Sequence, residues 1–501
     1  MFIHVILLLG FQSLSAQARH DYHWFLGGLN YSWPDSLWWS THLDFQQSPP
    51  QIKLVETKHR VNSQASTISD NFGNLLFYSN GCFIKNKDNN LMVNSDTLVP
   101  VYSYFNNCPT AGLMPPGGMI VCQDNYRKSK YWCINQGVDL VKYPDGGFNL
   151  SIKLYYSIVD MDKNLGFGSV ISKGNFVEPD SLYASIHAIP HQNGKDWWIM
   201  LGDEYTNTFY PMLIDSIGPR VTDTIFLAGA PPKNAGAGGQ VVFSPHGDRF
   251  LQFTPDQGTY WMDFDRSTGV VSNLQHYQWE IQDLFGGASI SPSGQYAYFN
   301  DYTHVWQMDL WAPDPTSTFT LIGEWDGYVD ENNSPVGFSK QRLGPDCRIY
   351  LGPSDFTRYI HIIEYPDRPF PDCHFQQRYI HTPTYITEGM PNFPLFRLGT
   401  QWPICDSTLT IPTAVRELDV QPSDLTLWPN PCTNALTIDL GHLPGPDVRM
   451  QVYDRQGRFM EEHQASGVQE VLFTAHWTPG MYVVRLIDEK GRSKMGKVMK
   501  E

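Results

Sequence analysis

Residues 241–251 read VVFSPHGDRFL, an apolar strand, a polar turn that contains Pro245 and Gly247, and a second apolar strand. Pro presets the φ angle of the second turn position, and Gly supplies the positive φ that such turns often need. Similar units recur at residues 67–78, 119–134, 189–199, 290–298 and 343–350. The stretch therefore predicts a hairpin that is repeated along the chain.

The spacing of these hairpins predicts the architecture. Their turn positions are Gly73, Arg127, Gly194, Gly247, Gly294 and Cys347, so successive spacings are 54, 67, 53, 47 and 53 residues. A period near fifty is typical of propeller blades with four strands each. We expect an all-β propeller of six or seven blades, and the pattern favours seven. Residues 22–45 and the segment before Pro394 would share the seventh blade and close the ring.

Three segments of this region resemble a known family. They are residues 68–81, residues 241–248 together with 264–273, and residues 389–393, which read GMPNF. They resemble secreted, WD-repeat-like propeller proteins of bacteria that use type IX secretion, and the resemblance covers roughly residues 22–400. It implies the propeller fold, but these motifs carry no known chemistry.

A smaller module follows a Pro-containing stretch of mixed polarity. Apolar residues alternate at 436, 438 and 440, at 448, 450 and 452, and at 482, 484 and 486, with polar Gly turns between such segments. Period-two alternation of this kind predicts a small β-sandwich.

This module resembles the type A sorting domain of type IX secretion. The matching segments are LWPNP at 427–431, VYDRQGR at 452–458, PGMYVVRL at 479–486 and KMGKVMK at 494–500. The resemblance implies a translocon and a sortase-like protease as partners. It also implies release, or attachment to the outer membrane at the cell surface. The residues that carry the sorting motif are Pro429, Asn430, Pro431, Gly457, Gly480 and Tyr482. The alternative is an ordinary terminal β-sandwich for binding.

The N-terminus has the features of a secretory signal peptide. Residues 2–11 are apolar except for His4, and Ala16-Gln17-Ala18 fits a cleavage site, although no Lys or Arg precedes it. The alternative is a buried N-terminal strand. No later apolar run is long enough for a membrane helix, so we expect a soluble mature chain. The expected divisions are a signal peptide at 1–18, a propeller at 19–400, a linker at 401–424 and a sorting domain at 425–501.

Composition excludes two classes of protein. The chain has 501 residues, 35 Lys and Arg against 51 Asp and Glu, and a net charge of −16. An acidic balance of this size argues against nucleic-acid binding. Aromatic residues make up 14% and charged residues 17%, which argues against a disordered chain.

The eight cysteines leave one pairing open. No CxxC motif occurs, which argues against a structural zinc site. Cys122 and Cys133 lie symmetrically about the turn at 124–130, so they could form a disulfide across a hairpin. Two buried free thiols are the equal alternative.

The sequence contains no G-x-S-x-G, H-E-x-x-H or P-loop motif, and we predict no catalytic residue, cofactor or metal site. His361, His374 and His381 could ligate a metal, but scattered packing or surface positions are favoured. The acidic loop at 326–333 could bind Ca²⁺, but a solvated loop is favoured. Trp198 and Trp261 are expected to pack between blades, whereas Trp33, Trp38 and Trp39 could equally bind a ligand.

Taken together, these features favour a non-catalytic binding or adhesion protein at the cell surface, with a glycan or protein as its unknown ligand. One alternative is a secreted hydrolase of glycans or peptides. Its carboxylates would meet in the propeller channel at about 5–10 Å from each other. Another is a structural component of a surface layer.

Overall fold

The computed structural model describes residues 18–27, 37, 39–57, 61, 64–108, 112–142, 148–179, 181–204, 206–227, 239–254, 257–278, 286–387, 389–398, 425–440, 448–454, 459–465, 469–487 and 493–501. The chain consists of two compact units, Met1–Thr410 and Ile411–Glu501, and each is considered by itself.

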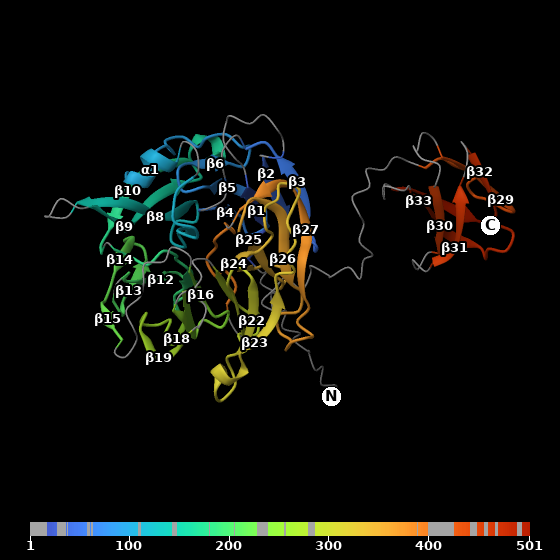
Figure 1. Cartoon of the computed structure of the whole chain (residues 1–501). Helices are drawn as coiled ribbons and strands as arrows, with labels where there is room; N and C mark the ends of the chain where they lie inside the picture. The colour runs from blue at the N-terminus through green and yellow to red at the C-terminus, as the bar shows by residue number, and fades with distance from the viewer. Residues whose placement is uncertain are drawn as a thin grey trace, which may run out of the picture. The chain divides into compact units, whose positions relative to one another are not determined.

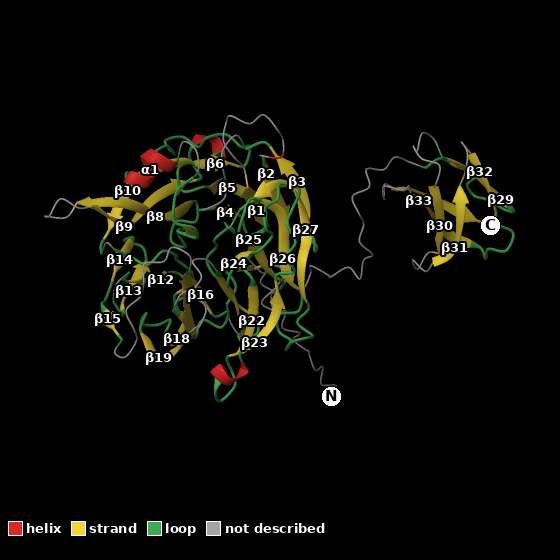
Figure 2. Ribbon diagram, in the orientation of Figure 1, coloured by secondary structure: helices red, strands yellow, loops and turns green. Residues whose placement is uncertain are grey.

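Seven antiparallel sheets follow one another in the described part of the first unit (Figures 1 and 2). The first four sheets consist of β1 (His23–Gly27), β2 (Ser40–Asp44) and β3 (Gln51–Val55); β4 (Ser66–Ser69), β5 (Leu75–Ser79) and β6 (Ile84–Asn86); β7 (Met119–Gln123), β8 (Lys130–Lys142), β9 (Phe148–Asp160) and β10 (Ser169–Val177); and β11 (Ala188–Pro190), β12 (Trp197–Gly202), β13 (Thr208–Ile214), β14 (Pro219–Val221) and β15 (Ile225–Phe226).

The other three sheets have four strands each. They consist of β16 (Gln240–Phe243), β17 (Arg249–Thr254), β18 (Gly258–Phe264) and β19 (Val271–Tyr277); β20 (Gly287–Ile290), β21 (Tyr296–Asn300), β22 (His304–Asp309) and β23 (Thr320–Glu324); and β24 (Phe338–Leu343), β25 (Ile349–Pro353), β26 (Thr357–Ile363) and β27 (Phe375–Ile386). Apart from β15, which pairs with β13, strands pair in chain order, so each sheet is a meander. We number the sheets as blades 1 to 7.

Apolar clusters join each blade to the next. Strand residues alternate between the two faces of a sheet, so every blade supplies side chains to two clusters. In blade 5, for example, Phe243 packs toward blade 4 and Val242 packs toward blade 6. A further cluster joins blade 7 to blade 1, where Tyr350 and Ile360 pack on Trp24 and Leu43. The blades therefore form a closed ring, a seven-bladed propeller.

The repeated turns have the backbone that the sequence predicts. Gly73, Gly194, Gly247 and Gly294 have φ angles between +70° and +86°. Cys347, which occupies the same turn position, has a φ of +68°. Arg127 is not among the residues with positive φ, so only the turn at 124–130 departs from the pattern.

Trp197 and Trp198 show how blades are held side by side. They are consecutive in β12 and therefore point to opposite faces of blade 4. The indole Nε1 of Trp197 donates to the carbonyl of Gln123 in blade 3 at 2.9 Å, and that of Trp198 donates to the carbonyl of Arg266 beside blade 5, also at 2.9 Å. Trp261 is likewise buried between blades 5 and 6. The predicted packing of Trp198 and Trp261 is confirmed.

The ring closes differently from the expectation. β1 pairs with β2 and β2 with β3, and none of the described strands from the far end of the propeller joins this sheet. The prediction that both ends share one blade is therefore wrong. Blades 7 and 1 meet side by side instead, through their apolar cluster and polar contacts such as Thr41 Oγ1 to Thr384 Oγ1 at 2.6 Å.

Of the two alternatives for Cys122 and Cys133, the structure shows the free thiols and not the disulfide, because the strand register separates the two side chains. Cys122 lies opposite Trp132, and Cys133 lies opposite Val121, so the two cysteines sit on adjacent rungs and opposite faces. Cys122 packs toward blade 4 and Cys133 toward blade 2. Both are buried free thiols, and burial raises the pKa of each.

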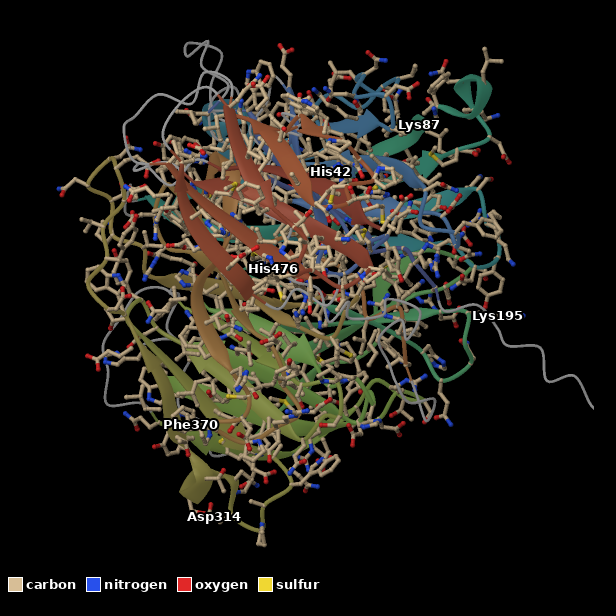
Figure 3. All side chains as sticks on the ribbon, turned by 90° about the vertical axis from the view of Figure 1, so that its right-hand side faces the viewer. His42, Lys87, Lys195, Asp314, Phe370 and His476 are labelled. Carbon is tan, nitrogen blue, oxygen red and sulfur yellow. A yellow bond between two sulfur atoms is a disulfide. The ribbon has the colours of Figure 1, made fainter. Side chains whose placement is uncertain are left out.

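Short helices and a disulfide decorate the propeller. The helix α1 (Tyr102–Asn107) ends at Cys108, which is disulfide-bonded to Cys82 in blade 2. Cys347 is also disulfide-bonded. The chain also forms the 3₁₀ helices η2 (Asn164–Gly166) and η3 (Pro315–Thr318). Asp314 caps η3 by accepting the Thr316 N–H at 3.1 Å, on a loop that projects from the propeller (Figure 3).

The second unit contains two facing antiparallel sheets. One consists of β28 (Leu427–Trp428), β29 (Ala435–Asp439) and β32 (Gln469–Phe473). The other consists of β31 (Phe459–Ala465), β30 (Val448–Asp454), β33 (Gly480–Ile487) and β34 (Ser493–Lys500). Their core includes all nine residues of the three alternating sets that the sequence indicates, at 436–440, 448–452 and 482–486. The predicted β-sandwich is therefore confirmed.

Candidate functional site in the central channel

Residues 389–398, which we call the plug segment, follow the last strand of the propeller and contact the inner side of the ring. The first strands of blades 1, 2, 3, 4 and 7, or the residues just before them, all form hydrogen bonds with it. Since these first strands neighbour one another around the ring, the plug segment fills much of the central channel.

Asn392 is the central contact of the plug segment. Its Nδ2 donates to the carbonyls of Gly117 and Ile186, at 2.9 and 2.8 Å, and its Oδ1 accepts from Nη2 of Arg342 at 2.7 Å. Its backbone N–H donates to the carbonyl of Ala65 at 2.8 Å. One buried residue thus joins blades 2, 3, 4 and 7 through a side chain and backbone whose polar groups are satisfied.

The plug segment continues with an apolar and an ionic contact. Phe396 packs against Trp197 and His20, with ring centroids 6.0 and 4.9 Å apart. Arg397 then forms a two-pronged ion pair with Asp21, at 2.7 and 2.5 Å. Geometry of this kind is the strongest ion-pair arrangement that proteins use, and it fixes the plug segment to blade 1.

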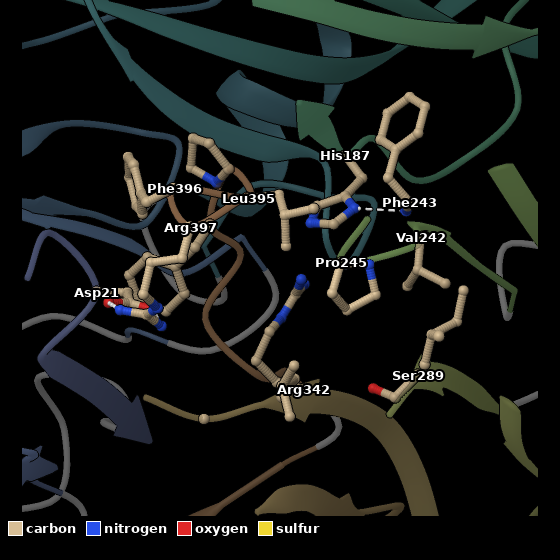
Figure 4. Close-up of a pocket in the computed structure, with 15 residues that line it drawn as sticks. Asp21, His187, Val242, Phe243, Pro245, Ser289, Arg342, Leu395, Phe396 and Arg397 are labelled. Atoms are coloured by element: carbon tan, nitrogen blue, oxygen red, sulfur yellow. Dashed lines mark hydrogen bonds and ion pairs between the residues drawn. The ribbon is translucent and has the colours of Figure 1, made fainter. Parts of the chain in front are cut away.

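A small cavity remains beside the plug segment (Figure 4). Its volume is about 60 Å³. The lining comes from the inner strands of blades 4 to 7 or the residues beside them, from Asp21 just before blade 1, and from the plug segment. Its polar side chains are those of Asp21, His187, Ser289, Arg342 and Arg397.

His187 and Arg342 in the cavity both have pKa values below their usual range. Burial, with a smaller effect from the charge of Arg342, holds the pKa of His187 well below its usual value. The neutral imidazole accepts the Phe243 N–H on Nδ1 at 2.9 Å. Burial also lowers the pKa of Arg342 to about 10, so this guanidinium stays protonated at neutral pH.

The cavity does not have the features that the hydrolase alternative requires. Asp21 is the only carboxylate in its lining, and Arg397 already neutralises it. Pockets for drug-sized ligands usually measure roughly 300–1,000 Å³, so about 60 Å³ cannot hold a sugar polymer or a peptide. The cavity can hold a few waters or one small ligand.

The structure separates the histidines that the sequence singled out. His361 is fully buried, and its Nδ1 accepts the Arg378 N–H at 3.2 Å. His374 lies 3.8 Å from Glu364, and the His381 ring packs in a tilted arrangement against Tyr359, with ring centroids 5.0 Å apart. Within the described residues, no group of three His, Cys, Asp or Glu side chains is arranged to hold a metal ion.

The acidic loop and the tryptophan cluster are partly explained. Asp326 pairs with Arg378 at 2.6 Å, and Asp330 accepts the N–H groups of its own turn. Trp39 is half-buried, whereas Trp33 and Trp38 lie outside the described residues.

Asn430 of the sorting motif has a clear structural role. Its Oδ1 accepts the Met499 N–H and its Nδ2 donates to the Lys497 carbonyl, both at 2.9 Å. Cys432, just after Pro431, adds a backbone bond to Met499 at 2.7 Å. The Pro-Asn-Pro turn thus holds the last strand of the chain, β34.

The other motif residues are spread over the sandwich. Tyr482 is buried, stacks on Trp477 with ring centroids 4.4 Å apart, and donates to the Thr478 carbonyl at 2.8 Å. Gly480 begins β33 with open space around it. Gly457 lies outside the described residues, as do residues 1–17 of the predicted signal peptide.

Sequence reasoning missed the two residues that organise the channel, Asn392 and Arg342. The segment 389–393 was noted for its resemblance, but it has no alternation that would place it in a strand. Its two prolines, Pro391 and Pro394, were the available signal for an extended segment outside any sheet. Nothing in the sequence around Arg342 marks that residue as facing a channel.

The fold defines the chain as a seven-bladed propeller with a C-terminal β-sandwich, and comparisons with known proteins identify the sandwich. Residues 426–501 match the family described as the secretion system C-terminal sorting domain. Such a domain marks a substrate of type IX secretion, so the chain is exported and is secreted or attached to the cell surface. No curated protein matches the sequence.

Solved structures similar to the chain include three with low identity. The Dos1 propeller is 12% identical, with 91% of this chain and 92% of that chain covered and a TM-score of 0.41. Apo AztD from Citrobacter koseri is 14% identical, with 74% and 96% covered and a TM-score of 0.34. A functionally unknown protein from Desulfotomaculum acetoxidans is 10% identical, with 75% and 99% covered and a TM-score of 0.38.

No helix in the described residues has both the length and the hydropathy of a transmembrane helix.

Proposed function

We propose that the chain is a non-catalytic binding or adhesion protein whose propeller is the exported cargo. The observation that supports this most is the plug segment, which occupies the channel where a propeller hydrolase would assemble its site. The remaining cavity of about 60 Å³ has one carboxylate, already paired with Arg397. A glycan or protein ligand would therefore bind on the outer loops and faces of the propeller.

We further propose the division of the chain into a signal peptide at 1–18, a propeller at 19–400, a linker at 401–424 and a sorting domain at 425–501. The boundary between the two compact units, at residues 410 and 411, falls inside the proposed linker. In this proposal the secretion translocon and a sortase-like protease recognise the domain through Pro429, Asn430, Pro431, Gly457, Gly480 and Tyr482.

Fractionation of the native host tests the export part of the proposal. The full chain is compared with a variant that lacks residues 425–501 and with a reporter protein that carries these residues. The reporter also carries residues 1–18, so that it crosses the inner membrane. We expect the truncated chain to accumulate in the periplasm and this reporter to reach the outside of the cell. A truncated chain that still reaches the surface would contradict the proposal.

A second experiment separates binding from catalysis. The purified full chain is screened on glycan and surface-protein arrays, and the ligands that it binds are then incubated with it and analysed by mass spectrometry. We expect saturable binding and an unchanged ligand. Cleavage of the ligand that does not occur in a control sample without the protein would instead support the hydrolase alternative.

A further inference from the structure

The channel cavity contains a half-buried cation, Arg342, that pairs with no carboxylate in the described part of the chain. Arg342 extends from β24 into the cavity (Figure 4), and the one hydrogen bond of its side chain to a described residue is the 2.7 Å contact from Nη2 to Asn392 Oδ1. Its Nε is buried and has no hydrogen-bond partner. No carboxylate in the described residues lies within ion-pair distance of it, and Asp21, the carboxylate in the described lining of the cavity, pairs with Arg397.

The surroundings make this positive charge costly. A buried charge is destabilising unless it is paired, and an unmatched guanidinium donor adds the cost of a lost hydrogen bond. His187 offers no compensation, because it is neutral and its Nδ1 already accepts the Phe243 N–H. The net charge of the cavity lining is therefore +1, with Asp21 and Arg397 cancelling each other.

The shape and chemistry of the walls restrict what can balance that charge. Val242, Pro245, Ile290 and Leu395 form apolar walls, and Ser289 adds a hydroxyl. A volume of about 60 Å³ admits about four or five heavy atoms, given that one water centre needs roughly 10–15 Å³. Planar carboxylates fit the guanidinium fork better than spherical anions do.

We propose that this cavity binds a short-chain carboxylate of about the size of acetate or propionate. The carboxylate lies against Nε and the free side of the Arg342 guanidinium, and the alkyl end lies against the apolar walls. The site is independent of the proposed adhesion function, because it lies in the channel and is lined by the plug segment and the inner strands.

Isothermal titration of the full chain with acetate, at constant ionic strength, tests the site. Acetamide is the neutral control of the same shape, and chloride is the spherical control. We expect saturable binding of acetate, with acetamide and chloride at least tenfold weaker, as expected for a charge-assisted contact. Equal binding of acetamide, equal binding of chloride, or no binding of acetate would overturn the proposal.

Two arginine variants locate the binding. Arg342→Gln keeps a donor for Asn392 but removes the charge, and we expect it to weaken acetate binding at least tenfold. Arg249→Gln is the matched control, since Arg249 donates to the Leu310 carbonyl at 2.8 Å outside the cavity. We expect it to bind acetate like the wild type. Near-UV circular dichroism checks that both variants fold. Acetate binding that survives in Arg342→Gln would overturn the assignment, and the acetamide comparison needs no variant.

Discussion

The two units of the chain each depend on an asparagine that follows a proline, but they place it differently. Asn392 is buried in the propeller channel and its side chain makes three hydrogen bonds. Asn430 is exposed on the sandwich and its side chain makes two. The same amide chemistry therefore holds together blades in one unit and the final strand in the other. From this difference we expect burial, and not the bond count alone, to decide how much stability each unit loses when these hydrogen bonds are removed.

Acidification should distinguish the two units most strongly. Burial lowers the pKa of His42 (labelled in Figure 3) and of His361 to about 3 in each case. The second cause is the charge of His23 for His42 and that of Arg378 for His361. Between pH 6.5 and 3 the unfolded chain binds more protons, so the stability is complete above pH 6.5 and falls as the pH falls. From pH 7 to pH 5 we expect each histidine to cost the propeller about 2 kcal/mol.

Hydrogen exchange measured by mass spectrometry at the two pH values, corrected for intrinsic exchange rates, reads the two units separately. The sandwich is the internal control, because the side chains of His463 and His476 are 43% and 61% exposed. Equal loss of protection in both units would refute the comparison.

The substitution Asn392→Ala should have the next largest effect. It leaves the Gly117 and Ile186 carbonyls and Nη2 of Arg342 without their partner, so we expect the propeller to lose about 3 kcal/mol in unfolding free energy. Urea denaturation followed by tryptophan fluorescence measures this loss. Asn125→Ala is a matched control, since Nδ2 of Asn125 makes a single bond to Lys195 near the surface. A loss no greater than that of the control would show that the plug segment does not depend on Asn392.

The substitution Asn430→Ala should have the smallest effect. Water can replace the amide at this exposed site, so we expect a loss of about 1 kcal/mol or less, confined to the sandwich. The measurement is hydrogen exchange at the amide of Met499, which loses its acceptor. Asn430→Asp keeps that acceptor and should retain protection there. Protection that is unchanged in Asn430→Ala would remove the structural role of this motif residue.

Local signals in the sequence predicted much of the fold. The turn glycines and Cys347 indicate turn positions that need a positive φ angle, which a single residue can satisfy. The alternation at 436–440 indicates a strand with one buried face. The failures concern contacts between distant residues. A disulfide between Cys122 and Cys133 required the two residues to lie opposite each other, but the strand register places them one residue apart. The prediction that both ends of the propeller share one blade required the segment before Pro394 to join the first sheet, whereas residues 389–398 lie in the channel. Neither the plug segment nor the cavity at Arg342 has a periodic pattern, because each arises from contacts between strands that lie far apart in the sequence.

The position of the plug segment has a consequence for the order of events during synthesis. The plug segment follows all seven blades in the sequence, so it is synthesised after them. A nascent chain that stops before residue 389 would lack the hydrogen bonds that Asn392 supplies to four blades at once. We therefore expect the propeller to reach its full set of contacts between blades only after residues 389–398 have been synthesised.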